Sequence, residues 1–148
     1  MRLGSLLAVN PQLDLTPPDI TDEDVFRRWL FENFQTIAIP EIPIEPVLEN
    51  NWVNFGLPYA NANFYKTADN RVHITGLVKL GILNSKIFTL PAGYIPVKRE
   101  MFLQAGQIAS SFTPIRIDVD DAGGVTQLNS SGVADWVSLA GISFQAAQ

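Results

Sequence analysis

From residue 51 onward, apolar and polar residues alternate with a period of two, and short turn sequences interrupt the alternation. The segment 71–79 reads RVHITGLVK, 112–120 reads FTPIRIDVD and 136–144 reads WVSLAGISF. Successive side chains of a β-strand point to opposite faces, so this alternation predicts strands that bury one face. Shorter strands are expected at 51–55, 63–67, 86–90, 100–108 and 124–128.

Turn-forming residues separate these segments at Asp69-Asn70, Asn84-Ser85, Gly123-Gly124 and 129–132. About eight short strands joined by frequent turns favour a mainly β protein with an antiparallel sandwich or jelly-roll-like body. The chain has 148 residues and no cysteine. A domain near this size buries enough apolar surface to fold without disulfides or a structural metal.

A different periodicity occupies residues 22–37. Thr21 is the expected N-cap, and the acidic residues after it complement the positive end of a helix. Apolar residues then recur three and four positions apart, which predicts one stripe along the helix. The helix could pack against its own domain, or several copies could associate around an axis. The candidate oligomerisation residues are Phe26, Trp29, Leu30, Phe34 and Ile37.

The segments on either side of this helix are rich in proline. Residues 1–20 contain three prolines that interrupt regular structure, yet they are too apolar for a solvated tail. They predict an extended arm that attaches to another subunit, with a frayed terminus as the alternative. The prolines at 40, 43 and 46 match the three-residue turn of polyproline II and indicate a stiff spacer. The candidate attachment residues are Leu3, Leu6, Leu7, Leu13 and Leu15.

The charge distribution supports a division of the chain near residue 50. Residues 1–50 hold nine acidic and three basic side chains, a net charge of −6, whereas residues 51–148 hold six and seven, a net charge of +1. We therefore expect an arm at 1–20, a helix and spacer at 21–50, and a body at 51–148. The overall charge of −5 disfavours nucleic acid as a partner. No uncharged stretch approaches a membrane span, so no membrane insertion is expected.

Few residues are candidates for catalysis or metal binding. His73 is the single histidine, lies in the middle of an expected strand, and cannot form a His-rich metal site alone. The segment DVDDAGG at 118–124 matches the start of a calcium loop, but Ala122 replaces a ligand and no glutamate follows. A hairpin is the simpler interpretation, with Gly123 and Gly124 supplying positive φ.

The acidic residues of the body mostly lie next to turns, where aspartate serves the backbone. A domain this short leaves little room for a substrate cleft, so a polysaccharide-cleaving enzyme is disfavoured. The sequence predicts no enzymatic activity, no catalytic residue, no metal and no cofactor. Tyr59 and Tyr94 differ from the other aromatic residues because each lies in a proline-bearing loop, GLPYANA or PAGYIP. Each is either a binding contact or a plug for its loop.

Three stretches carry a resemblance to a known family. They are WVNFGLPYANANFYKTADNRVHITGLVKLG, IFTLPAGYIPVKREMF and RIDVDDAGGVTQLNSSGVADWVSLAGISF, at 52–81, 87–102 and 116–144. Together they resemble the C-terminal head domain of tailed-bacteriophage fibre and spike virion proteins. The resemblance implies a trimeric β-sandwich displayed on a phage particle. Similar domains often carry a basic residue where this chain has Ile95, and an exposed isoleucine there would suit a subunit contact.

Two functions follow from this resemblance. In the first, the chain is a small homotrimeric fibre or spike on the virion. Residues 1–50 attach it to capsid or tail proteins, and its body contacts a host-surface glycan or protein through loops bearing Tyr59, Tyr94 and Ile95. In the second, it is a capsid decoration or head-fibre protein that stabilises the shell without host recognition.

Overall fold

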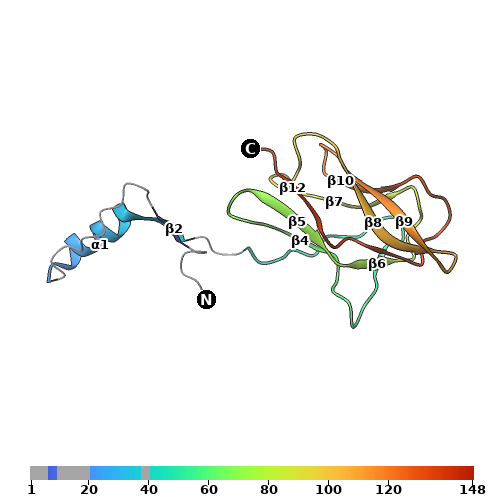
Figure 1. The fold of residues 1–148 in the computed structure, drawn as a ribbon, viewed down its shortest axis with the longest axis horizontal. Helices are drawn as coiled ribbons and strands as arrows, with labels where there is room; N and C mark the ends of the chain where they lie inside the picture. The colour runs from blue at the N-terminus through green and yellow to red at the C-terminus, as the bar shows by residue number, and fades with distance from the viewer. Residues whose placement is uncertain (1–6, 10–20, 38–40) are drawn as a thin grey trace. The chain divides into compact units, whose positions relative to one another are not determined.

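The computed structural model describes residues 7–9, 21–37 and 41–148. Contacts divide the chain into two units, Met1–Pro40 and Glu41–Gln148, which we call the N-terminal unit and the body (Figure 1). Among the described residues, no helix has the length and apolar character needed to cross a membrane.

Within the described residues of the N-terminal unit, one helix, α1, occupies Glu23–Asn33. Asp22 caps it, because its Oδ1 atom accepts hydrogen bonds from the backbone N–H groups of Asp24 and Val25 at 3.0 and 3.3 Å. The expected cap at Thr21 is therefore wrong by one residue. The acidic first turn lies at the positive end of the helix, where carboxylates are stabilising.

The helix is shorter than the sequence predicts. Residues Phe34–Ile37 form strand β2, which pairs antiparallel with strand β1 at Leu7–Val9. Backbone pairing with a distant segment overrides the helical spacing of the apolar residues. Phe34 and Ile37 therefore do not continue the stripe of α1, and the prediction of one helical stripe to Ile37 is wrong.

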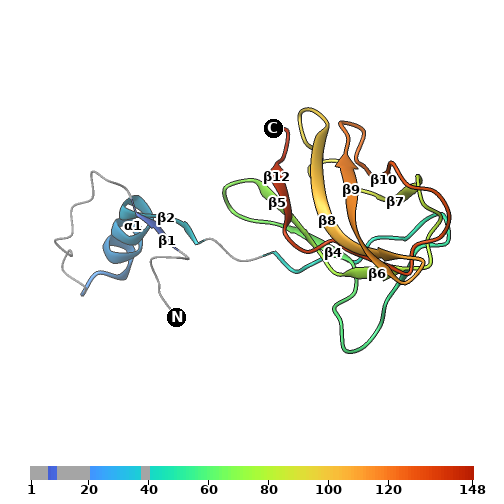
Figure 2. The same ribbon diagram turned by 45° about the vertical axis from the view of Figure 1, so that its right-hand side comes forward.

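The body consists of two antiparallel sheets, which confirms the mainly β sandwich-like prediction. One sheet has seven strands in the order β3-β6-β11-β8-β9-β10-β7, and the other has three in the order β12-β5-β4 (Figures 1 and 2). The strands are β3 Val53–Asn54, β4 Asn63–Lys66, β5 Arg71–Thr75, β6 Leu77–Lys79, β7 Lys86–Thr89, β8 Glu100–Ile108, β9 Ser111–Val119, β10 Gly124–Leu128, β11 Trp136–Ser138 and β12 Ile142–Gln145.

Two of the expected long strands are each divided between the sheets. The segment 71–79 becomes β5 and β6, and 136–144 becomes β11 and β12. Gly76 lies at the first crossing with a φ of +114°, and a Cβ atom there would lie 2.5 Å from the carbonyl oxygen of Asn61. The N–H of Leu139, at the second crossing, donates to the Gly76 carbonyl at 2.8 Å. This hydrogen bond therefore links the two points at which the chain passes from one sheet to the other, which we call the crossings.

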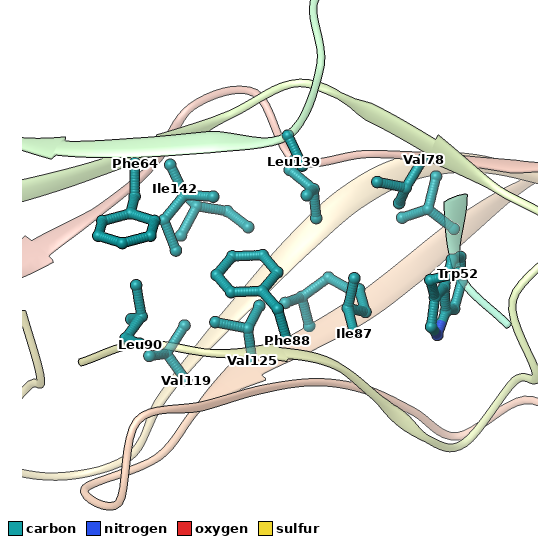
Figure 3. Packing of buried hydrophobic residues seen from close by; sticks show 14 of the residues in the cluster. Trp52, Phe64, Val78, Ile87, Phe88, Leu90, Val119, Val125, Leu139 and Ile142 are labelled. Carbon is teal, nitrogen blue, oxygen red and sulfur yellow. The ribbon is translucent and has the colours of Figure 1, made fainter. Parts of the chain in front are cut away.

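The core lies between the two sheets (Figure 3). Phe64 and Ile142 project from the three-stranded sheet toward Phe88 and Val125 of the seven-stranded sheet, and these side chains are at most 2% exposed. The Phe64 and Phe88 rings stack with centroids 6.4 Å apart. Full burial of each large apolar side chain contributes about 1.5–3 kcal/mol, so this core dominates the stability of the body.

Residues 41–50 pack on the rest of the body. The backbone of Ile44 exchanges two hydrogen bonds with that of Phe64, at 2.8 and 3.0 Å, and the Glu49 N–H donates to the Ile87 carbonyl at 2.8 Å. The segment therefore contributes an extra β-bridge to β4, whereas we expected the prolines at 40, 43 and 46 to form a spacer outside the body. The boundary between the units lies at Pro40.

Candidate binding groove

A groove of about 490 Å³ opens on the outer side of the seven-stranded sheet. The loop between β3 and β4 projects beside β6 (Figure 2). Its residues Phe55, Tyr59 and Ala60 form one wall of the groove. Strands β6, β8 and β11 form the floor, and the two crossings between the sheets close one side. The groove is lined by Phe55, Tyr59, Ala60, Thr75, Gly76, Leu77, Ala105, Trp136, Ser138 and Ala140.

Backbone hydrogen bonds fix the loop wall against the sheet. The N–H of Phe55 donates to the Leu77 carbonyl at 2.9 Å, and the N–H of Leu77 donates to the Ala60 carbonyl at 3.1 Å. Within the loop, the N–H of Tyr59 donates to the Gly56 carbonyl at 3.0 Å. The groove is therefore held open by main-chain contacts that need no ligand.

Aromatic rings provide most of the apolar surface of the groove. Phe55 and Tyr59 meet edge to face with centroids 5.1 Å apart, and Tyr59 is 53% exposed. On the floor, the indole N–H of Trp136 donates to Gln107 Oε1, and the Trp136 ring meets Phe112 edge-on at 6.0 Å. These contacts orient the rings before any ligand binds.

The lining residues include no acidic or basic side chain. Their polar side-chain groups are the hydroxyls of Tyr59, Thr75 and Ser138 and the indole N–H of Trp136, which donates to Gln107. Lys79 lies beside the groove, with its ammonium nitrogen 4.9 Å from the centre of the Phe55 ring. The lining is thus apolar with a few uncharged donors and acceptors, which is typical of small-molecule sites.

Of the three predicted loop residues, the structure places only Tyr59 in the groove. Tyr94 is half-buried, with its ring edge-on to Phe64 at 5.0 Å, and its hydroxyl donates to Glu41. That hydrogen bond, together with burial and the Glu41 charge, raises the pKa of Tyr94 to about 12. Ile95 is also half-buried and packs on the core, so the expectation that it is exposed is wrong.

His73 and the acidic loop at 118–124 have ordinary structural surroundings. The His73 ring stacks on Tyr65 with centroids 5.1 Å apart, on the outer face of the three-stranded sheet. Asp120 Oδ1 accepts hydrogen bonds from the N–H groups of Ala122 and Gly124, each at 2.9 Å. The predicted hairpin between β9 and β10 is confirmed, with Gly123 at a φ of +90°. The expectation of a positive φ at Gly124 is wrong, because Gly124 already belongs to strand β10.

Two other carboxylates of the body have side-chain partners. Asp118 is 2% exposed and forms a bidentate pair with Arg116, with both nitrogen–oxygen distances 2.8 Å. This hydrogen bonding raises the pKa of Arg116. The Thr67 hydroxyl donates to Asp69 Oδ1 at 2.5 Å, and this bond lowers the pKa of Asp69. Both aspartates therefore stabilise local structure.

A cluster of exposed apolar residues lies on the same outer face as the groove. Met101, Leu103 and Phe112 are 65, 75 and 73% exposed. Leu103 follows Met101 by two residues, and Phe112 pairs across the strands with Gln107, so all three point to one face of the β8–β9 hairpin. We call these three residues the β8–β9 patch. Phe112 also contacts Trp136, which joins the patch to the groove.

The predicted oligomerisation and attachment residues belong to the N-terminal unit. The rings of Phe26 and Trp29 stack on α1 with centroids 6.2 Å apart and an interplanar angle of 17°. Leu7 lies in β1, paired with Ile37 of β2. The side chains of Leu30, Phe34 and Ile37 lie outside the described part of the structure, as do Leu3, Leu6, Leu13 and Leu15.

Comparison with known proteins gives a likeness in fold. No family model matches the sequence, and no curated protein matches it. Among solved structures, the crystal structure of the receptor binding protein (gp15) of Listeria phage PSA is similar, with a TM-score of 0.57 and 19% sequence identity. The alignment covers 75% of this chain and 67% of that chain. Over that share of its length, the chain therefore has a fold that is also found in a phage receptor binding protein.

Proposed function

We propose that this chain is a structural protein of a phage particle, a small trimeric fibre or spike whose body is displayed and contacts the host surface. The observation that carries this proposal is the fold shared with the phage receptor binding protein over 75% of the chain. The motifs at 52–81, 87–102 and 116–144, which resemble fibre and spike head domains, support it independently.

The exposed β8–β9 patch supports self-association of the body. Single exposed apolar residues are common on soluble proteins, but contiguous apolar patches usually mark interaction sites. The three large side chains of the patch, each at least 65% exposed, point to one face of the hairpin, with the paired residues Ala105 and Pro114 between Leu103 and Phe112. The Arg116–Asp118 ion pair lies opposite Met101 and Leu103 on the same face. Burial of this face between copies would remove it from water, as a trimer requires.

The separate N-terminal unit supports a role in attachment. Residues 1–40 form their own unit, while residues 41–50 belong to the body, so the proposed attachment segment is 1–40. The body has a complete core of its own. Three of its acidic residues, Asp69, Asp118 and Asp120, are engaged in turns and an ion pair.

Deletion of residues 1–40 tests this proposal. We expect the truncated body to retain its near-ultraviolet circular dichroism and cooperative unfolding, because every buried residue of the core cluster lies after residue 40. We expect purified particles to lose the protein, measured by immunoblotting against the major capsid protein. Full loading of the truncated body would contradict the attachment role.

Immunogold labelling of intact particles locates the protein. Label on the tail or at a spike supports the fibre proposal, and label distributed over the capsid shell would replace it with a decoration protein. Absence of label and of immunoblot signal from particles would contradict a virion function altogether.

A further inference from the structure

We propose that the groove binds an uncharged pyranose ring of a surface glycan. This inference rests on the proposed function, since it names the kind of host molecule that the displayed body recognises. It extends that function by assigning the site and the residues that hold the sugar.

The arrangement of the lining suits the two kinds of surface that a pyranose presents. One face of such a ring carries C–H groups that pack against aromatic rings, and its edge carries hydroxyls. Phe55 and Tyr59 supply aromatic surface on the loop wall, and Trp136 supplies it on the floor. Small lining residues, including Gly76 and Ala105, leave the space between these aromatic rings unfilled.

Hydroxyl groups lie among these rings. Ser138 pairs directly with Leu77 across strands β11 and β6, which places the serine hydroxyl on the floor of the groove. Thr75 contributes a second hydroxyl at the crossing from β5. Each hydroxyl can both donate and accept a hydrogen bond, as sugar hydroxyls do. A few placed polar groups on an apolar lining give a site its orientation and specificity.

Charge complementarity favours a neutral ligand. A phosphate-rich polymer or nucleic acid needs several lysine or arginine donors, whereas none lines the groove and Lys79 beside it lies over the Phe55 ring. A peptide that added a strand would need free backbone groups at the wall, but the N–H groups of Phe55 and Leu77 are already bonded within the body. The uncharged, preformed groove therefore fits a glycan better than a polypeptide.

Saturation-transfer NMR on the full-length chain tests the inference. The probes are the methyl glycosides of glucose, galactose, mannose, N-acetylglucosamine and rhamnose. We expect at least one to receive saturation from the protein, and Tyr59→Ala to weaken its binding about tenfold, since an aromatic contact is worth roughly one factor of ten. Tyr59 is 53% exposed, so its removal leaves the core intact.

Tyr65→Ala is the matched control, because Tyr65 lies on the outer face of the three-stranded sheet and does not line the groove. It should bind the glycoside as the wild type does. Trp136→Phe keeps a ring on the floor and should reduce affinity less than Tyr59→Ala. If no glycoside binds the folded protein, or if Tyr59→Ala and Trp136→Phe both bind as tightly as wild type, the inference is overturned.

Particle assays separate this inference from the proposed function. Groove-dependent sugar binding by a protein absent from particles would support the groove and overturn the virion role. Presence of the protein in particles, together with an absence of groove-dependent sugar binding, would support the virion role and overturn the assignment of the groove. A third outcome combines three results: Tyr59→Ala abolishes adsorption, protease treatment of the cells also abolishes it, and no glycoside binds. In that case the partner is a surface protein, and the sugar proposal is overturned.

Discussion

The two sheets of the body present very different outer faces. On the three-stranded sheet, the outward residues Arg71, His73 and Ser143 are polar, and the Arg71 guanidinium donates to the Ser143 hydroxyl at 3.1 Å. On the seven-stranded sheet, the β8–β9 patch and the groove present large apolar side chains. One face therefore suits solvent, and the other has the composition of a surface that contacts other molecules.

The residue patterns of the strands account for this difference. In β5, RVHIT, the inward residues Val72 and Ile74 alternate with polar outward ones, as expected for a sheet with one solvated face. In β8, the run Met101-Phe102-Leu103 is apolar on both faces, and only Phe102 packs on the core. A loss of alternation within an antiparallel strand therefore indicates a second contact surface.

The largest expected effect concerns the joint between the two sheets, that is, the crossing at Gly76. Gly76→Ala places a Cβ atom 2.5 Å from the backbone of Asn61 and Ala62 at a φ of +114°. Since rigid backbone must move to relieve the clash, we expect a loss of about 3 kcal/mol or more in the free energy of unfolding. Urea denaturation followed by circular dichroism measures it.

Gly132→Ala is the matched control for this change. Gly132 also has a positive φ, +103°, but a Cβ atom there would have no neighbour within 4 Å. It should therefore cost only the conformational strain, about 1 kcal/mol. Equal losses for Gly76→Ala and Gly132→Ala would show that close packing at the joint does not hold the two sheets together.

The next largest effect concerns association. Leu103→Glu places a charge at the most exposed side chain of the β8–β9 patch and should weaken the proposed self-association at least about tenfold. Light scattering coupled to size-exclusion chromatography measures the mass at matched concentrations. His73→Glu makes the same kind of change on the three-stranded sheet and should leave the mass unaltered. A Leu103→Glu protein with the wild-type oligomeric mass would exclude the patch as the interface.

The sequence predicts the body of this fold well because its signals are local. Alternation and turn residues place β4, β7, β8, β9 and β10 within one or two residues of their observed ends. The crossings at Gly76 and at 139–141 are harder to predict, because a strand that changes sheets keeps its alternation. The end of α1 is missed since β2 forms only by pairing with β1, a contact distant in sequence.

The candidate site is less predictable than the fold. Tyr59 is identified by its proline-bearing loop, but Trp136 reads as an ordinary strand residue, and only the register of β11 places it in the groove. Tyr94 also lies in a proline-bearing loop, but its side chain is packed within the body and does not line the groove. Its partner Glu41 lies in a segment that reads as a spacer, so the hydrogen bond between them has no local signature.

That hydrogen bond provides the smallest expected effect. Tyr94→Phe keeps the ring against Phe64 and removes only the hydroxyl that donates to Glu41. We expect a loss of about 1 kcal/mol at neutral pH, since this is the usual net contribution of one hydrogen bond. His73→Glu and Leu103→Glu alter the outer faces, whereas this change tests a contact between residues 41–50 and the rest of the body.

The pH dependence of this loss distinguishes the hydrogen bond from simple packing. The pKa of Tyr94 is raised to about 12 in the folded protein, whereas an unfolded tyrosine titrates near 10. The unfolded state therefore releases this proton first, so the stabilisation is fully present below about pH 10 and is lost as the pH rises toward about 12. Urea midpoints of wild type and Tyr94→Phe at pH 7, 9, 10 and 11 measure the difference, in which the other titrating groups cancel. A difference that stays constant from pH 7 to 11 would assign the contribution of Tyr94 to its ring alone.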